Sequence, residues 1–381
     1  METVTIDGLP IGDGYPPRIM SVLNMSEQSG YGPSVYLAPE EAARFVDEEL
    51  VPAGADIVDV GLQSANPKYE AKPVEKELDR LEEVAPILDH IEADVPISLE
   101  TRYAEVAEAA IGHGFDIIND VCGFADPEMK PTLEAHDMPV VKMASPPDLA
   151  RPGALKTVDD LFEAIQRDGF TDRTIIDPAF GGWYDERTFE DNYELFRRLR
   201  EFRAFGRPIL TATNREDFLG ALADKLTTAD QLPVSLAAAT MEVERGAHVI
   251  RTHDTDATAD VVKVAHALGD RRVADPDPPA VVELPGTTVG EAARQAALGT
   301  VRTHSPQAAL TRAFVVGDLT DTDVATLLET DPEAAVVERD DSLYIVGTTP
   351  QLDALAAAID GASDRLSAVA ERLRQATARE C

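Results

Sequence analysis

The chain of 381 residues contains little cysteine, little lysine and no long apolar stretch. Its two cysteines, Cys122 and Cys381, form no CxxC pair, so the sequence gives no sign of a cysteine metal cluster. Only eight of the 34 basic residues are lysines, whereas 70 residues are acidic and the net charge is −36. The negative electrostatic field of such a chain opposes binding to nucleic acid or to an anionic membrane surface.

The acidic residues are spread along the chain rather than gathered in one tail, so we interpret them as adaptation to a salt-rich cytoplasm. A strongly basic partner is the alternative interpretation. No stretch approaches the roughly 18 apolar residues that a membrane helix needs. The first residues lack the charged and apolar regions of a secretory signal. We therefore expect a soluble cytoplasmic protein with one large domain and one small one.

Eight short apolar runs recur along the chain, and polar or charged residues follow each run at once. Helical stretches separate most of them. This alternation predicts an α/β fold of the parallel (β/α)8 TIM barrel class, in which the carboxyl ends of the strands form one pocket. The runs are 19–23, 57–60, 97–99, 117–118, 140–141, 175–176, 209–210 and 249–250.

The helices between these runs are predicted from the spacing of apolar residues and from the Gly or Pro residues at their ends. Their expected ranges are 39–53, 74–91, 104–112, 127–135, 158–168, 189–205, 235–245 and 258–268.

The sequence predicts four parts: an N-terminal arm (1–17), the barrel (18–270), a stiff proline-containing linker (271–282) and a small α+β domain (283–381). The last part contains no recognisable catalytic constellation. Its expected elements are strands at 313–316, 334–337 and 343–346, a helix at 322–328 and a long helix at 352–376.

Polar residues at the ends of different strands would share the mouth of this barrel. Carboxylates and amides there suit a ligand edge that is rich in N–H donors. Arg251 and His253 lie two residues apart on one strand, so both would point to the same side and could hold a phosphate. The predicted set is Asn24, Glu100, Asn119, Asp120, Asp177, Arg251 and His253.

Each of these residues also has a structural interpretation, as a turn former, as a helix cap or as part of a charge network with Asp254 or Asp256. Their joint placement at the ends of separate strands favours the functional interpretation. Asn24 would be a ligand for a Mg²⁺ ion that accompanies the phosphate.

Seven segments, in this order and spacing, match one enzyme family: 22–26, 54–61, 96–101, 104–107, 117–123, 176–181 and 251–254. Over roughly residues 18–270 the chain resembles dihydropteroate synthase, the pterin-binding barrel enzyme of folate synthesis. The resemblance is that of a diverged member from a salt-adapted organism. It implies a transferase that generally forms homodimers.

The resemblance implies a pterin deep in the barrel, with its aminopyrimidine edge on Asp177 and with Asn119 and Glu100 beside it. Arg251, His253 and a Mg²⁺ near Asn24 would hold the diphosphate of 6-hydroxymethyl-dihydropterin diphosphate. Diphosphate would leave as the C–O bond breaks, and the amine of 4-aminobenzoate or a related arylamine would attack the cationic methylene. Arg251 and His253 are then the expected catalytic residues, which act by orientation and electrostatic support.

The chain departs from the family at several positions. Glu216 stands where the family has the lysine that contacts the pterin, so either Arg215 replaces that lysine or the ligand differs. The first loop (26–30) and the second loop (61–67) lack the usual motifs, Glu100 replaces an aspartate, and Ala144 stands where a histidine is common. Two alternatives therefore remain: a pterin barrel with methyltransferase-type chemistry, and a non-catalytic pterin-binding paralogue.

Overall fold

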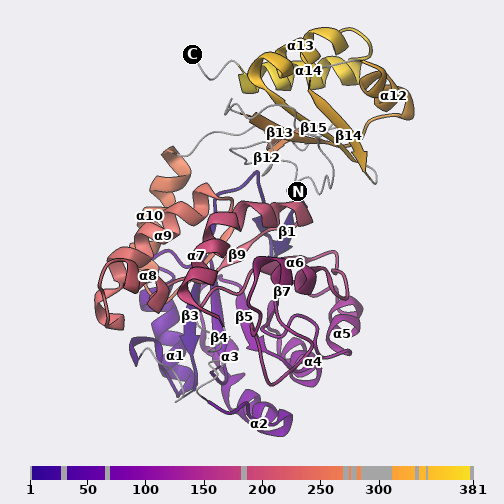
Figure 1. Cartoon of the computed structure of the whole chain (residues 1–381). Coiled ribbons are helices and arrows are strands. Elements are labelled where there is room, and N and C mark those ends of the chain that lie inside the picture. The colour runs from indigo at the N-terminus through magenta and orange to yellow at the C-terminus, as the bar shows by residue number, and fades with distance from the viewer. Residues whose placement is uncertain are drawn as a thin grey trace. The chain divides into compact units, whose positions relative to one another are not determined.

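The computed structural model describes residues 2–26, 32–64, 69–181, 187–268, 274–275, 281–284, 311–330, 334–339 and 342–377. These residues divide into two compact units (Figure 1). The first contains the described residues of 2–199 and 207–268, and the second contains 200–206 with the described residues after 270. Within the described residues, no helix is both long enough and apolar enough to cross a bilayer.

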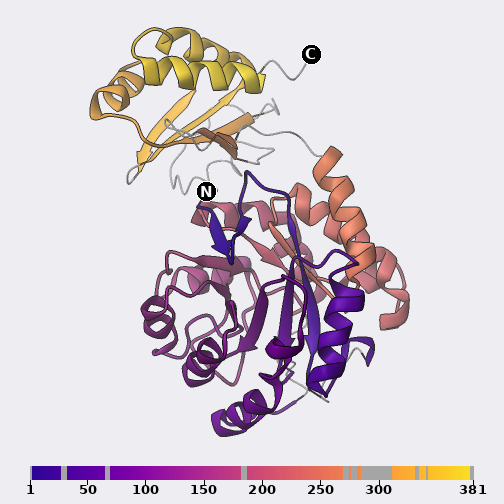
Figure 2. The same cartoon turned by 180° about the vertical axis from the view of Figure 1, so that it is seen from behind.

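The first unit is an eight-stranded parallel barrel surrounded by helices (Figures 1 and 2), which confirms the predicted fold class. The strand order is β8-β7-β6-β5-β4-β3-β10-β9, and a bridge between Ile176 and Ile209 closes the ring. The strands are β3 (Arg18–Asn24), β4 (Ile57–Gly61), β5 (Ile97–Thr101), β6 (Ile117–Asp120), β7 (Val140–Met143), β8 (Thr174–Asp177), β9 (Leu210–Thr211) and β10 (Val249–Thr252).

The helices follow the predicted ranges with two corrections. The helix expected over 74–91 is divided into α2 and α3, because Pro86 lies between them and cannot continue a helix. The helix expected over 189–205 is α-helical only to Arg198 and continues as a 3₁₀ helix, Leu199–Phe205. The α-helices are α1 (Pro39–Phe45), α2 (Val74–Val84), α3 (Ile87–His90), α4 (Ala104–His113), α5 (Met129–Ala135), α6 (Val158–Gln166), α7 (Phe189–Arg198), α8 (Asp217–Leu222), α9 (Leu232–Glu244) and α10 (Thr255–Leu268).

The helix predicted over 39–53 is α1 continued by the π-helical turn Val46–Leu50. Three short helical segments were not predicted: α8 and the 3₁₀ turns Gly32–Ser34 and Thr228–Asp230. Each is too short to give a helical period in the sequence.

The N-terminal arm expected over 1–17 contains a hairpin that was not predicted, formed by β1 (Val4–Ile6) and β2 (Leu9–Ile11). Asp7 and Gly8 form its two-residue turn with φ of 42° and 80°, as a primed turn requires. Val4, Ile6 and Ile11 are buried against the first inward-facing residues of the barrel strands. The hairpin therefore seals the amino end of the barrel with apolar side chains.

Side chains along each barrel strand point alternately into the barrel and outward to the helices. This alternation determines which residues lie above the hairpin. One apolar layer packs with the hairpin: Met20, Ile57, Ile117, Val141, Ile175, Leu210 and Val249. Their neighbours Val58 and Ile118 pack into the outer core with the helices. The residue two places further along a strand returns to the barrel interior. That residue is Asp59 on β4, Asn119 on β6, Asp177 on β8 and Arg251 on β10.

The second unit contains a five-stranded sheet in the order β11-β12-β13-β15-β14. The stiff linker predicted for 271–282 is partly wrong, because Ala274–Asp275 and Val281 lie in β-strands that pair antiparallel. The long helix predicted over 352–376 is divided near Gly361, whose φ of +82° is left-handed. The elements are β11 (Ala274–Asp275), β12 (Val281–Leu284), β13 (Thr311–Val316), α12 (Asp321–Glu329), β14 (Ala335–Arg339), β15 (Ser342–Thr348), α13 (Thr349–Ile359) and α14 (Asp364–Thr377).

Lys142 on β7 points away from the barrel interior and is fully buried beneath α6. Its ammonium group donates to the carbonyl oxygens of Ile165 at 3.0 Å, Arg167 at 2.5 Å and Gly169 at 2.8 Å. Burial lowers its pKa to about 8. A buried cation thus satisfies the carbonyls at the end of α6 that the helix itself cannot pair.

We expect Lys142→Met to lower the free energy of unfolding by about 3 kcal/mol, because a buried acceptor left unpaired costs about 1 to 3 kcal/mol. Urea unfolding followed by circular dichroism measures this. Lys76→Met is the matched control, since the Lys76 side chain is 70% exposed. Equal stability losses in the two variants would contradict this role of Lys142.

Candidate active site

Asp59 lies at the centre of the polar layer and joins four strands of the barrel. Its Oδ2 accepts hydrogen bonds from Arg251 Nε at 2.7 Å and from Asn119 Nδ2 at 3.0 Å. Its Oδ1 accepts from Ser98 Oγ at 2.6 Å. The other end of the Arg251 guanidinium donates from Nη2 to Glu100 Oε2 at 2.7 Å. We call these five residues the Asp59 cluster.

One guanidinium in this cluster faces several carboxylates. Burial raises the pKa of Glu100 to about 7; the charge of Arg251 opposes this shift and that of Asp59 adds to it. Burial lowers the pKa of Arg251, but the carboxylates of Asp59 and Glu100 outweigh this effect, so the pKa is raised. Arg251 therefore stays charged, whereas the carboxyl group of Glu100 is partly protonated at neutral pH.

Asp177 ends β8 and is 6% exposed. Its Oδ1 accepts the backbone N–H of Ala179 at 2.7 Å. Burial raises its pKa to about 6, while the positive charges of Arg251 and Arg187 act in the opposite direction. At neutral pH Asp177 is thus a buried carboxylate close to the Asp59 cluster, and it can accept hydrogen bonds from a ligand.

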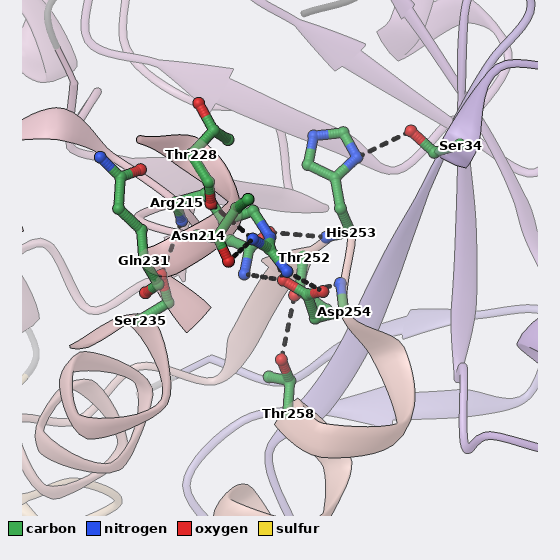
Figure 3. Close-up of polar contacts among 11 residues, drawn as sticks. Ser34, Asn214, Arg215, Thr228, Gln231, Ser235, Thr252, His253, Asp254 and Thr258 are labelled. Atoms are coloured by element: carbon green, nitrogen blue, oxygen red, sulfur yellow. Dashed lines mark hydrogen bonds and ion pairs between the residues drawn. The ribbon is translucent and has the colours of Figure 1, made fainter. Parts of the chain in front are cut away.

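The predicted residues Asn24 and His253 form a second group together with Ser34, which was not predicted. Ser34 Oγ lies 2.9 Å from Asn24 Nδ2, which donates to it, and 3.0 Å from His253 Nδ1. Figure 3 shows the imidazole of His253 turned toward Ser34. Burial and the nearby Arg251 lower the pKa of His253 to about 3. His253 is therefore neutral at pH 7 and can offer hydrogen bonds but no charge.

Arg215 lies in a different group at the end of β9. Its Nε and Nη2 donate to the two carboxylate oxygens of Asp254 at 2.7 and 2.8 Å, and its Nη1 donates to Thr228 O at 2.5 Å (Figure 3). Asn214 joins this group by donating to Asp254 Oδ2 at 2.9 Å. The guanidinium is thus oriented by Asp254 rather than by the Asp59 cluster, and the contact of Arg215 with the pterin stays a prediction.

Asp120 has the structural role that was considered for it. Its two carboxylate oxygens accept the backbone N–H groups of Cys122 at 2.9 Å and Phe124 at 2.6 Å. Gly123 between them has φ +59°, and a Cβ there would lie 2.2 Å from Met143 O. Asp120 therefore fixes the loop after β6. Most of the altered first and second loops (27–30 and 65–67) lies outside the described residues.

Comparisons with known proteins show the family to which the chain belongs. The sequence profile described as "pterin binding enzyme" matches residues 20–253. The dihydropteroate synthase of Bacillus subtilis is 30% identical over 277 residues, which cover 70% of this chain and 94% of that protein.

The chain belongs to the pterin binding enzyme family. The resemblance found in the sequence motifs is thereby confirmed.

Two further relatives extend the comparison. A probable bifunctional folylpolyglutamate synthase/dihydropteroate synthase of Halobacterium salinarum is 31% identical over 289 residues, which are 70% of this chain. This chain spans only 34% of that relative, about a third of its length. A solved dihydropteroate synthase from Coxiella burnetii, in complex with pteroic acid, has a TM-score of 0.59 and 31% identity. The match covers 70% of this chain and 98% of that one.

Sequence reasoning missed several residues of this pterin binding enzyme's site. Asp59 was read only as part of a strand, although an acidic residue between Val58 and Val60 is itself a signal of an inward-facing polar position. Ser34 carries no such signal, because it lies in a 3₁₀ turn distant in sequence from its partners.

Glu242 on α9 was missed as well, although it is fully buried. Its carboxylate accepts from Thr211 Oγ1 at 2.8 Å and from Thr213 Oγ1 at 2.5 Å. Burial raises its pKa to about 7, and the two threonine hydroxyls act against this shift. Glu242 thus fixes the carboxyl end of β9, which leads directly into Asn214 and Arg215.

We expect Glu242→Gln to flatten the pH dependence of stability. The pKa of Glu242 is raised from 4.5 to about 7, so the folded state holds this proton more tightly than the unfolded chain does. That stabilisation is complete below about pH 4.5 and is lost as the pH rises through about 7, a total of about 3 kcal/mol at 1.36 kcal/mol per unit. The glutamine variant has no proton to release at this position, so its stability lacks this dependence on pH.

The measurement is urea unfolding of wild type and variant at several pH values between 4.5 and 8. The difference in unfolding free energy should shift in favour of the variant as the pH rises. Glu105→Gln is the control, because Glu105 is exposed at the start of α4. A difference independent of pH would show that Glu242 has the same pKa in both states.

Proposed function

We propose that this chain is a dihydropteroate synthase, a transferase that condenses 6-hydroxymethyl-dihydropterin diphosphate with 4-aminobenzoate and releases diphosphate. The observation that carries the proposal is the polar layer of Asp59, Asn119, Asp177 and Arg251 within a barrel whose relatives are dihydropteroate synthases. The Coxiella burnetii relative binds pteroic acid, which is a pterin joined to 4-aminobenzoate. The proposed reaction makes the dihydro form of this joined compound.

The pterin-binding residues in this proposal are Glu100, Asn119 and Asp177. The aminopyrimidine edge of a pterin presents adjacent N–H donors, and a buried carboxylate such as Asp177 accepts them in pairs. Asn119 and Glu100 are already oriented through Asp59 and Arg251. A site whose groups are held before the ligand arrives loses less entropy on binding.

Arg251 and His253 are the proposed catalytic residues at the diphosphate end. Arg251 uses Nε and Nη2 within the Asp59 cluster, and its Nη1 has no hydrogen-bond acceptor among the described residues. This third nitrogen is suited to an oxygen of the leaving diphosphate. His253, neutral and beside Ser34, would contribute a directed hydrogen bond.

A Mg²⁺ ion is proposed as the cofactor, with Asn24 as its protein ligand. No group of three acidic, histidine or cysteine residues able to hold a metal occurs in the described part of the chain. This fits an ion that is carried largely by substrate phosphates, because Mg²⁺ often takes only one or two protein ligands. When bound, the ion would neutralise charge that develops on the diphosphate.

The proposed reaction needs no covalent enzyme intermediate. The C–O bond to the diphosphate breaks and leaves positive charge on the pterin methylene. The amine of 4-aminobenzoate, or of a related arylamine, then forms the C–N bond and loses one proton. Asp177 and Asn119 hold the pterin ring in place, while Arg251 offsets the charge of the departing group.

We also propose that the protein acts as a cytoplasmic homodimer in a salt-adapted organism, without nucleic acid or membrane partners. The net charge of −36 supports the salt adaptation and the absence of anionic partners.

In high-salt buffer with Mg²⁺, we expect purified protein to release diphosphate only when both the dihydropterin diphosphate and 4-aminobenzoate are present. Asp177→Asn should weaken pterin binding by about 100-fold, because a charge-assisted hydrogen-bond pair is lost in a buried site. Asp159→Asn is the control, since the Asp159 side chain is 82% exposed. Tight pterin binding without diphosphate release would sink the synthase reaction and leave only the pterin site.

Asn24→Ala tests the proposed metal ligand. The variant should need about tenfold more Mg²⁺ for half-maximal diphosphate release, because the proposed protein ligand of the ion is lost. Binding of 6-hydroxymethylpterin, which carries no diphosphate, should stay unchanged. An unaltered Mg²⁺ requirement in the variant would rule out Asn24 as a ligand.

A further inference from the structure

Arg187 is a buried cation that has no role in the proposed reaction. The residue is 6% exposed, and its Nη1 donates to Ala179 O at 2.5 Å. Its Nε and Nη2 are buried and have no hydrogen-bond partner among the described residues. Buried N–H groups of a guanidinium are costly when unpaired. Two unpaired donors in a barrel enzyme therefore point to a ligand that pairs them.

Gly181 and the start of α7 (Phe189–Arg198) are each fixed by hydrogen bonds. Asn192 on α7 accepts from Gly181 N and donates to Gly181 O, both at 3.1 Å. Thr188, directly after Arg187, caps α7, because its Oγ1 accepts from the Asp191 N–H at 3.3 Å. Arg187 therefore directly precedes the capped first turn of α7.

Ala179 brings Arg187 and Asp177 to the same place. Its N–H donates to Asp177 Oδ1 at 2.7 Å, and its carbonyl accepts from Arg187 Nη1 at 2.5 Å. This geometry uses a left-handed backbone at Ala179, with φ of 59°. The carboxylate of Asp177 and the guanidinium of Arg187 are therefore both hydrogen-bonded to Ala179, just after β8. An acceptor and a donor thus lie close together.

Glu216 provides a further charge beside Arg187. The carboxylate oxygens of Glu216 lie 3.1 and 3.2 Å from the position that a Cβ on Gly181 would take, so they face the loop after β8. Burial lowers the pKa of Arg187 to about 10, while the carboxylates of Asp191, Glu216 and Asp177 oppose this shift. Arg187 thus remains charged at neutral pH, and the anionic Glu216 has a cation close by.

We infer, on the basis of the proposed function, that Arg187 determines which pteridine the site accepts: its unpaired N–H groups bind the 4-oxo group, and Asp177 binds the adjacent N–H donors. A 2-amino-4-oxo-pteridine presents one carbonyl acceptor next to two N–H donors along a single edge. The pair of Arg187 and Asp177 presents the complementary pattern.

A 2,4-diaminopteridine carries an amino group in place of the 4-oxo group. Its N–H donors would face those of Arg187, and the guanidinium would again be left unpaired. A site built to hydrogen-bond one group discriminates strongly against an analogue that lacks it. Arg187 thus selects oxo-pterins over their diamino counterparts.

The experiment compares the affinities of 6-hydroxymethylpterin and its 2,4-diamino counterpart by calorimetric titration. Wild type should prefer the oxo compound by about 100-fold. Arg187→Gln should bring this ratio close to one, because an amide can turn to present either a donor or an acceptor. Arg187→Lys presents donors only, so it should keep the preference at a lower affinity. Arg197→Met, at a side chain 60% exposed on α7, should keep the wild-type ratio.

The measured affinity ratios distinguish a role of Arg187 in ligand selection from a purely structural role. If the Gln and Lys variants show the same ratio as wild type while both still bind the oxo compound, Arg187 has only a structural role and the inference is wrong. If wild type binds neither pteridine, the proposed function fails and the inference fails with it. A ratio is measured within one folded preparation, so partial unfolding of a variant lowers both affinities and leaves the ratio unchanged.

Discussion

The polar layer of the candidate site depends on the fully buried carboxylate of Asp59. Its two oxygens accept hydrogen bonds from Ser98, Asn119 and Arg251, which come from β5, β6 and β10. A buried carboxylate is tolerable only when such partners surround it. The cluster therefore fixes the position of Arg251, and through Arg251 that of Glu100, before any ligand is present. Preorganisation of this kind is what a reaction driven by orientation and electrostatics requires.

The polar layer follows from the same periodicity that builds the barrel. An inward-facing isoleucine or valine on a strand is followed two residues later by Asp59, Asn119, Asp177 or Arg251. The eight apolar runs were therefore sufficient to predict both the barrel and most of its mouth. Periodicity gives the face of the strand to which a side chain belongs, but it gives no information about which partner that side chain selects.

The errors of the sequence analysis have separate physical causes. The N-terminal hairpin was missed because its strands have three residues each, although Asp7-Gly8 is a strong turn signal. The contact of Arg215 with the pterin stays a prediction, but no signal in the sequence indicated that its guanidinium pairs with Asp254, 39 residues further along the chain. Arg187 was overlooked because its importance rests on unpaired nitrogens, a property of packing that no motif encodes.

The hairpin at the amino end of the barrel restricts how ligands exchange. Because Val4, Ile6 and Ile11 complete an apolar floor, the described barrel offers its polar layer only one approach, from the carboxyl ends of the strands. A pterin resting on that layer lies beneath anything that enters later. In the proposed reaction a pterin diphosphate that binds first would lie beneath the arylamine, and the joined product would leave through the opening by which both arrived.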